Sequence, residues 1–271
     1  MKLTFYGVRG SVPTPGQNTA KYGGNTTSIL LENNAGEFLI LDAGTGIRSL
    51  GREIPKGENE IYILLSHNHW DHIQGFPYFD PIYNPQKKIT IIPGLTHENE
   101  PNAILKQMNG SFFPINPNEL AATISVSPIK EDNWEYKTFE ILRCKMNHPG
   151  GGSAYKITTD EVSIVYATDN ELFPPYPVST SFDEWVQFSR NADFLIHDGQ
   201  YLPEDYPLKC GWGHSQIQHA LDLAKQAQVK NLVFVSHDPD RTDDQLDKLQ
   251  SELEQSDYEF RILFAYEGLT L

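Results

Sequence analysis

The sequence predicts an α/β protein whose helices lie outside its β-sheets. Short apolar runs typical of strands fill the first part of the chain, and helical and strand patterns alternate in the second part. A chain of 271 residues can bury roughly three-quarters of its unfolded surface, so it is long enough to fold around a core without disulfide bonds. We therefore expect one domain over residues 1–271.

Strand patterns dominate the first part of the chain. Residues 2–8, 27–32 and 37–42 are apolar runs separated by turns. Residues 33–36 are typical of a hairpin connection, because Asn and Gly tolerate positive φ. Residues 60–65 form an apolar, β-branched run, which predicts a buried strand. A short helix is expected at 44–54, and further strands are expected at 88–93, 124–128, 137–145, 153–158 and 162–167.

Helix and strand patterns alternate in the second part. Five apolar residues recur at helical spacing and form one stripe: Ile217, Ala220, Leu221, Ala224 and Ala227. They predict a helix over residues 215–227. Thr242 and Gln245 have the form of a capping box and predict the start of another helix. A helix is also expected at 182–190, and strands are expected at 193–197, 231–236 and 259–264.

The composition limits the possible partners and compartments. Lys and Arg number 21 against 36 Asp and Glu, which gives a net charge of −15. This charge argues against a protein that wraps long nucleic acid, because such affinity comes from neutralising phosphates. No apolar run approaches the roughly 20 residues of a membrane helix, and the N-terminus lacks the pattern of a signal peptide. We expect a cytoplasmic protein in which Cys144 and Cys210 are reduced thiols.

A dense group of potential metal ligands follows the predicted strand at 60–65. His67, His69, Asp71 and His72 lie within six residues, and imidazole and carboxylate groups are good ligands for Zn²⁺ and related divalent ions. In an extended segment alternate residues share a face, so His67 and His69 can face one ion. A turn after His69 can direct Asp71 and His72 toward a second ion. Two such ions can hold the attacking and leaving oxygens of a displacement.

Three more candidate ligands follow predicted strands in the same way. His148 comes after the strand at 137–145, Asp169 after the strand at 162–167, and His237 after the strand at 231–236. Strand ends present side chains at the edge of a sheet, where a site can form. We therefore expect these three residues to complete the metal site.

The ligand series resembles that of the metallo-β-lactamase superfamily nearly from end to end. The resemblance implies a four-layer αββα sandwich with a dinuclear site at the edges of its sheets. It places His67, His69 and His148 on one ion, places Asp71, His72 and His237 on the other, and makes Asp169 the bridge. It implies two divalent ions, with Zn²⁺ favoured by the His-rich set and Mn²⁺ or Fe as alternatives.

Further motifs resemble the tRNase Z group of this superfamily. They are the opening Gly-rich stretch at 5–14, residues 193–199, where Asp198 stands in place of a Glu, and the Gly-His-Ser at 213–215. The resemblance implies that Asp198 and His214 pair as a proton shuttle. A histidine oriented by a carboxylate can protonate a leaving alkoxide at neutral pH. Asp71, Asp198 and His214 are therefore the candidate catalytic residues, of which Asp71 is also a ligand.

The predicted substrate is a small anionic phosphodiester. Members that process tRNA carry a long basic arm, whereas here only 20 residues separate His148 from Asp169, and residues 238–259 hold nine acidic residues against Arg241 and Lys248. The chain is similar in this respect to arm-less relatives, the anti-Pycsar cyclic nucleotide phosphodiesterases, which form homodimers. We predict hydrolysis of 3′,5′-cyclic nucleotides to nucleoside monophosphates by a homodimer, with no long nucleic acid and no membrane as partner.

Other functions stay open at this stage. A 3′-end ribonuclease of the tRNase Z type, another small-molecule hydrolase of the same fold and a non-catalytic nucleotide-binding protein are the alternatives. Phe112 and Phe113 are unusual neighbours in a polar segment. They are compatible with a base-stacking pocket, a dimer contact or ordinary burial.

Overall fold

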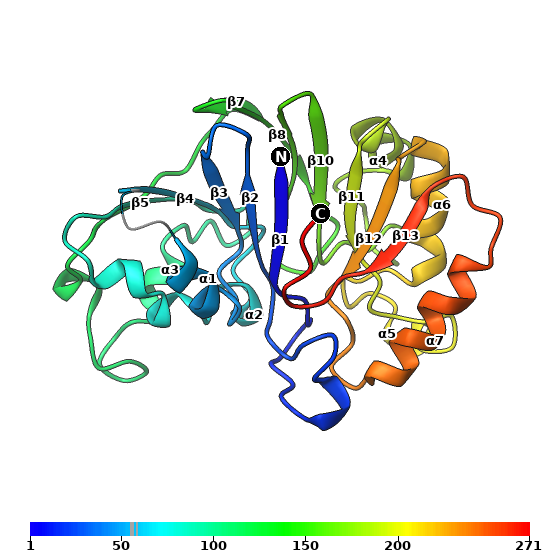
Figure 1. The fold of residues 1–271 in the computed structure, drawn as a ribbon, viewed down its shortest axis with the longest axis horizontal. Helices are drawn as coiled ribbons and strands as arrows, with labels where there is room; N and C mark the ends of the chain where they lie inside the picture. Colours follow the sequence, from blue (N-terminus) through cyan, green and yellow to red (C-terminus); the bar gives the residue numbers. More distant parts are fainter. Residues whose placement is uncertain (55–56, 58) are drawn as a thin grey trace.

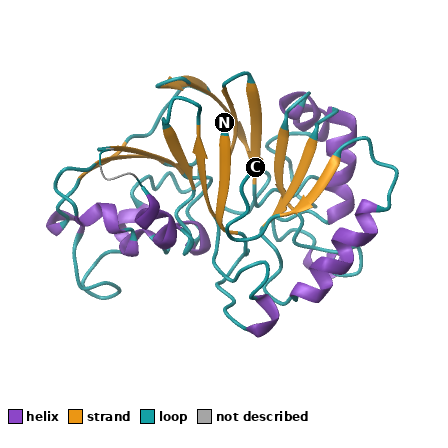
Figure 2. Cartoon of the chain, viewed as in Figure 1, coloured by secondary structure: helices purple, strands orange, loops and turns teal. Residues whose placement is uncertain are grey.

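Two β-sheets face each other in the computed structural model, and helices cover their outer faces (Figure 1 and Figure 2). The structure describes all residues except 55, 56 and 58. The N-terminal strand lies near the middle of the molecule (Figure 1).

The first sheet has six strands in sequence order, β1-β2-β3-β4-β5-β6. The first three strands pair antiparallel, and the pairs from β3 to β6 are parallel. The strands are β1 (Lys2–Gly7), β2 (Ser28–Glu32), β3 (Phe38–Leu41), β4 (Glu60–Leu64), β5 (Lys88–Ile92) and β6 (Thr123–Val126).

The second sheet has seven strands in the order β13-β12-β11-β10-β9-β8-β7. The pairs from β13 to β10 are parallel, and those from β10 to β7 are antiparallel. The strands are β7 (Asn133–Tyr136), β8 (Phe139–Lys145), β9 (Ser153–Thr159), β10 (Val162–Ala167), β11 (Phe194–Asp198), β12 (Asn231–Val235) and β13 (Arg261–Phe264).

The helices divide between the two outer faces. The α-helices are α1 (Ile47–Glu53), α2 (Trp70–Ile73), α3 (Ala103–Lys106), α4 (Phe182–Ser189), α5 (Tyr206–Lys209), α6 (Ile217–Ala227) and α7 (Asp243–Glu254). Short 3₁₀ helices lie at Gln17–Thr19, Phe76–Tyr78, Asp80–Tyr83 and Pro117–Glu119. Figure 2 shows α1 to α3 beside the first sheet and α4, α6 and α7 beside the second.

Three apolar cores separate these layers. Side chains of β3 alternate between two of them: Leu39 and Leu41 face the second sheet, whereas Phe38 and Ile40 face the helices of the first half. The third core lies between the second sheet and its helices. The arrangement is the expected four-layer αββα sandwich.

Most of the elements expected from the sequence form. The stripe on α6 is fully buried, and the predicted capping box opens α7, where Thr242 Oγ1 accepts a hydrogen bond from the Gln245 backbone N–H. The edge strand β7 was not predicted, because its four residues alternate between exposed and half-buried positions and lack an apolar run. Both cysteines are free thiols. Within the described residues, no helix is long and apolar enough to cross a membrane.

Candidate metal centre

The dense ligand motif lies where β4 ends and α2 begins. His69 is the N-cap of α2 and has an extended backbone (φ −62°, ψ 151°), whereas Asp71 and His72 lie in the first turn of the helix. The segment is therefore extended through His69 and turns immediately afterwards. This local geometry is the one expected from the spacing of the ligands.

The first group of ligand atoms comes from His67, His69 and His148. These atoms all lie within 4.8 Å of one another. His69 Nδ1 and His148 Nε2 are 2.9 Å apart, and His67 Nε2 is buried without a hydrogen-bond partner. His148 follows β8, and its Nδ1 lies 2.8 Å from the Gly213 carbonyl oxygen, which orients the ring. Three imidazole nitrogens therefore converge on one point.

The second group joins His67 and His72 to Asp169, again with ligand atoms within 4.8 Å. His72 Nε2 lies 3.2 Å from both Asp169 Oδ2 and Asp71 Oδ2. The distance from His67 Nε2 to Asp169 Oδ2 is 3.7 Å. Asp169 follows β10 in a left-handed conformation (φ 50°) and is buried. Its carboxylate thus lies between the residues expected for the two ions.

A third group contains His148, Asp169 and His214. His214 Nε2 lies 4.0 Å from Asp169 Oδ2, and His214 Nδ1 lies 3.5 Å from Asp198 Oδ2. The Asp198 carboxylate also accepts hydrogen bonds from the backbone N–H groups of Asn170 and Ser215. The structure thus brings Asp198 and His214 together at the edge of the ligand cluster, at an ion-pair distance at which His214 Nδ1 makes no hydrogen bond.

The structure does not bring His237 into these groups. Its Nε2 lies 2.7 Å from the Ala265 carbonyl oxygen, and its ring packs against Tyr22 and Phe264. The preceding residue, Ser236, faces the cluster instead, with its Oγ 3.0 Å from Asp169 Oδ1. Ser236 follows β12 in a left-handed conformation (φ 51°), so the regular alternation of side chains along the strand ends before it. His237 was expected beside Asp71 and His72, and this geometry departs from that expectation.

A family model agrees with this arrangement. The model for the β-lactamase superfamily domain matches residues 38–237, which is more than half of the chain. The chain belongs to this superfamily. The match includes every candidate ligand and both members of the Asp198–His214 pair. The chain is a metal-dependent hydrolase.

Several relatives of this superfamily member span almost its whole length. A ribonuclease Z of Haloarcula marismortui is 22% identical over 316 residues, covering 99% of this chain and 96% of the relative. The metallo-β-lactamase fold protein YhfI of Bacillus subtilis has a TM-score of 0.71 at 18% identity, over 100% and 98% of the two chains. A diphosphatase of the PhnP family has a TM-score of 0.71 at 17% identity, over 100% and 96%. YhfI and the PhnP-family diphosphatase share the fold of this chain.

The charges of the cluster suit divalent cations. Burial favours neutral imidazole, but the carboxylates of Asp71, Asp169 and Asp42 outweigh it and raise the pKa of His72 well above its usual value. By contrast, burial lowers the pKa of His148 to about 4, so its ring is neutral and has a free nitrogen lone pair. The carboxylates attract positive charge, and the neutral imidazoles next to them offer nitrogen lone pairs. The buried His67 Nε2 has no hydrogen-bond partner. This donor set fits Zn²⁺ or a similar ion.

Asp42 orients this cluster and was not found from the sequence. It follows β3, and its carboxylate accepts hydrogen bonds from Ser66 backbone N–H at 2.6 Å and from Ser66 Oγ at 2.7 Å. Tyr166 Oη donates at 2.6 Å, and His72 Nδ1 lies at 2.8 Å. Such a partner fixes the tautomer of a ligand histidine and increases its basicity. The signal in the sequence is an acidic residue just past an apolar strand: Asp42 directly follows β3, and Asp169 follows β10 after Thr168.

Glu171 orients the other side of the site and was also missed. Its carboxylate is buried and accepts hydrogen bonds from the backbone N–H groups of Gly211 and Gly213, at 2.8 and 2.9 Å, and from Tyr206 Oη at 2.9 Å. These bonds hold the loop that places His214 and presents the Gly213 carbonyl to His148. Nothing in the local sequence marks Glu171, because all of its partners lie about 35 to 42 positions further along the chain.

Proposed function

We propose that this chain is a dinuclear phosphodiesterase that hydrolyses 3′,5′-cyclic nucleotides to nucleoside monophosphates. The observation that carries the proposal is the position of Asp169. Its carboxylate lies beside His67, His72 and His214 at once, within the groups that also contain His69 and His148. A carboxylate shared between a group of three imidazoles and the neighbouring pair of Asp71 and His72 is a donor arrangement that suits two metal ions.

The proposal assigns His67, His69 and His148 to one ion and Asp71 and His72 to the other, with Asp169 shared. His237 remains a proposed ligand from the family resemblance alone. When bound, two divalent ions lower the pKa of water to near neutrality and neutralise phosphoryl oxygens. Zn²⁺ is the proposed native metal because imidazoles dominate the donor set.

The proposed proton donor is His214, held by Asp198. In the described geometry Asp169 and Asp198 outweigh the effect of burial and raise the pKa of His214 to about 9. The ring lies at the edge of the ligand cluster, where a leaving oxygen needs a proton, and the nearby Asp198 carboxylate favours its protonated form. The Asp198 carboxylate is itself held in position by hydrogen bonds from two backbone N–H groups.

A small substrate is supported by the connection between His148 and Asp169. That segment contains β9 and β10, which are joined by Asp160 and Glu161 alone, with φ values of 51° and 63°. Positive φ at both positions is typical of a tight hairpin turn. No arm to hold tRNA projects from this hairpin, and α7 adds acidic residues to the surface. A cyclic nucleotide needs no basic surface, because its single phosphodiester enters the cation site itself.

The second candidate function is RNA processing, because the curated relatives are named ribonuclease Z. The two functions predict different products. We propose incubation of the zinc-loaded protein with cAMP, cGMP, cCMP and cUMP, with and without a chelator, followed by chromatography. A precursor tRNA is incubated in parallel.

The expected result is nucleoside monophosphate that forms only without chelator, with the tRNA left intact. Cleavage of the tRNA precursor with no cyclic nucleotide hydrolysis would refute the proposal in favour of the ribonuclease. Tight nucleotide binding with no product from either substrate would refute both. The same preparation shows by sedimentation whether the proposed homodimer forms.

A further inference from the structure

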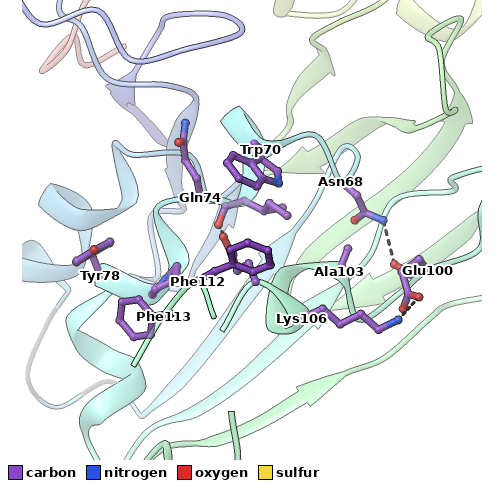
Figure 3. A pocket seen from close by; sticks show the side chains of 12 residues that line it. Asn68, Trp70, Gln74, Tyr78, Glu100, Ala103, Lys106, Phe112 and Phe113 are labelled. Carbon is purple, nitrogen blue, oxygen red and sulfur yellow. Dashed lines mark hydrogen bonds and ion pairs between the residues drawn. The ribbon is translucent and has the colours of Figure 1, made fainter. Parts of the chain in front are cut away.

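A cavity of about 550 Å³ lies beside the metal centre, and its lining is unusually aromatic. Trp70, Tyr78 and Phe112 line it with large parts of their side chains exposed, at 69%, 59% and 74%. Figure 3 shows Trp70 and Phe112 near the middle of the cavity, with Tyr78 and Phe113 to one side. Exposed aromatic side chains gathered around one hollow indicate a binding site.

The aromatic rings come from two segments that meet only in the folded chain. Trp70 begins α2, and Phe112 and Phe113 follow α3. The rings of Tyr78 and Phe113 contact edge to face, with centroids 5.6 Å apart and an interplanar angle of 87°. This contact supports one wall of the cavity, and Trp70 and Phe112 keep their faces accessible.

The cavity adjoins the metal centre. A smaller cavity of about 190 Å³ is lined by His67 and His69, and it shares Asn68, Glu100 and Ala103 with the larger one. Trp70 is also the next residue after His69. A molecule with its phosphate at the histidines would therefore have the aromatic cavity next to it, along these shared residues.

The lining carries little net charge. Lys106 and Glu100 form an ion pair across the cavity wall, and Asn68 Nδ2 donates to the Glu100 carbonyl oxygen at 2.9 Å (Figure 3). A second phosphate would find no net positive charge to bind in this cavity. A flat, uncharged ring can stack on the aromatic side chains and make apolar contacts there. The cavity volume lies within the range of small-molecule sites.

We propose that this cavity binds the base of the nucleotide whose phosphodiester lies at the metal centre, with Trp70 and Phe112 as the stacking residues. The inference deepens the proposed function and rests on it for the position of the phosphate. Stacking is tolerant of base identity because every base has an aromatic face. The enzyme should therefore accept several bases and should bind a base-free analogue more weakly.

The test compares the affinities of AMP and ribose 5-phosphate, which carry the same phosphate with and without a base. We propose calorimetry on the zinc-loaded wild type and on Trp70→Ala and Phe112→Ala. Tyr266→Ala is the matched control, because Tyr266 is also exposed (44%) but does not line the cavity. Trp70 and Phe112 are mostly exposed, so the variants should keep the fold, which thermal unfolding checks.

We expect the Kd of AMP to rise roughly 5- to 100-fold in Trp70→Ala and Phe112→Ala, the scale of one lost stacking contact. The Kd of ribose 5-phosphate should stay unchanged, and Tyr266→Ala should affect neither ligand. An unchanged Kd of AMP would overturn the inference. So would an equal rise for both ligands, or loss of a homodimer in Trp70→Ala with AMP binding intact.

This test separates the two proposals. It measures binding of a hydrolysis product, so it does not depend on turnover. AMP binding that requires Trp70, in a protein that hydrolyses no cyclic nucleotide, would support the cavity and refute the proposed reaction. Hydrolysis that proceeds with normal AMP affinity in both variants would support the reaction and refute the cavity.

Discussion

Replacing Asp42 tests how the metal ligands are held in place, because Asp42 contacts a ligand histidine but is not itself a ligand. We consider Asp42→Asn, because Asp42 has a positive φ of 58° and Asn tolerates this conformation well. The substitution keeps the shape and the backbone and removes only the negative charge and one acceptor. Its effects therefore report on the hydrogen bonds to Ser66, His72 and Tyr166.

The magnitude follows from the hydrogen bonds. Oδ1 of Asp42 accepts from Ser66 backbone N–H, whereas Oδ2 faces Ser66 Oγ, Tyr166 Oη and His72 Nδ1. In either orientation the amide of Asn places its N–H₂ against at least one of these donors. One buried donor without an acceptor lowers the free energy of unfolding by about 1–3 kcal/mol. Loss of the partner of a ligand histidine weakens metal binding by roughly 10- to 100-fold.

Two measurements follow, with one matched control. Competition with a chromophoric chelator gives the Kd of zinc, and denaturant unfolding of the metal-free protein gives the change in stability. Asp160→Asn is the control, because Asp160 also has a positive φ (51°) but lies in the β9–β10 turn and accepts a hydrogen bond from Asn34 backbone N–H. Zinc affinity in Asp42→Asn equal to that of the wild type would refute the assigned role, as would an equal loss in Asp160→Asn.

Three further substitutions test other parts of the site. His69→Ala should abolish both metal at the first group and cyclic nucleotide hydrolysis, measured by elemental analysis and product chromatography; full metal content would contradict the assignment. His214→Ala should keep its metal while turnover falls roughly 10²- to 10⁴-fold, and unchanged kcat would exclude it as proton donor. In Glu171→Gln one buried backbone N–H of the loop that places His214 loses its acceptor. We expect kcat to fall roughly 10- to 100-fold with metal retained, because His214 is then misplaced. A kcat equal to that of the wild type would show that this loop does not need the Glu171 carboxylate.

The sandwich could be predicted because its signals are local. Strand β4 buries both of its faces, so residues 60–65 are almost continuously apolar. The stripe on α6 and the capping box of α7 are likewise contained within a few residues. The three four-residue helices α2, α3 and α5 carry no such signal, because one turn is too short to show a period.

The site could be predicted in part. Ligands that lie close together in the sequence, such as His67 and His69, can be recognised from their spacing. Residues that support them do not, because Asp42 meets Tyr166 across 124 positions. The position of His237 shows a second limit. A strand end presents one residue to the site and turns its neighbour away, and sequence spacing does not show whether Ser236 or His237 faces inward.

The most direct test of the central claim is an anomalous difference map recorded at the zinc absorption edge from crystals of the zinc-loaded protein. We expect one peak coordinated by His67, His69 and His148, and a second beside His72, with Asp169 in contact with both. The same map shows whether His214 or His237 approaches either ion. Absence of a peak among these residues, or zinc bound only elsewhere on the protein, would contradict a dinuclear metal centre at this site.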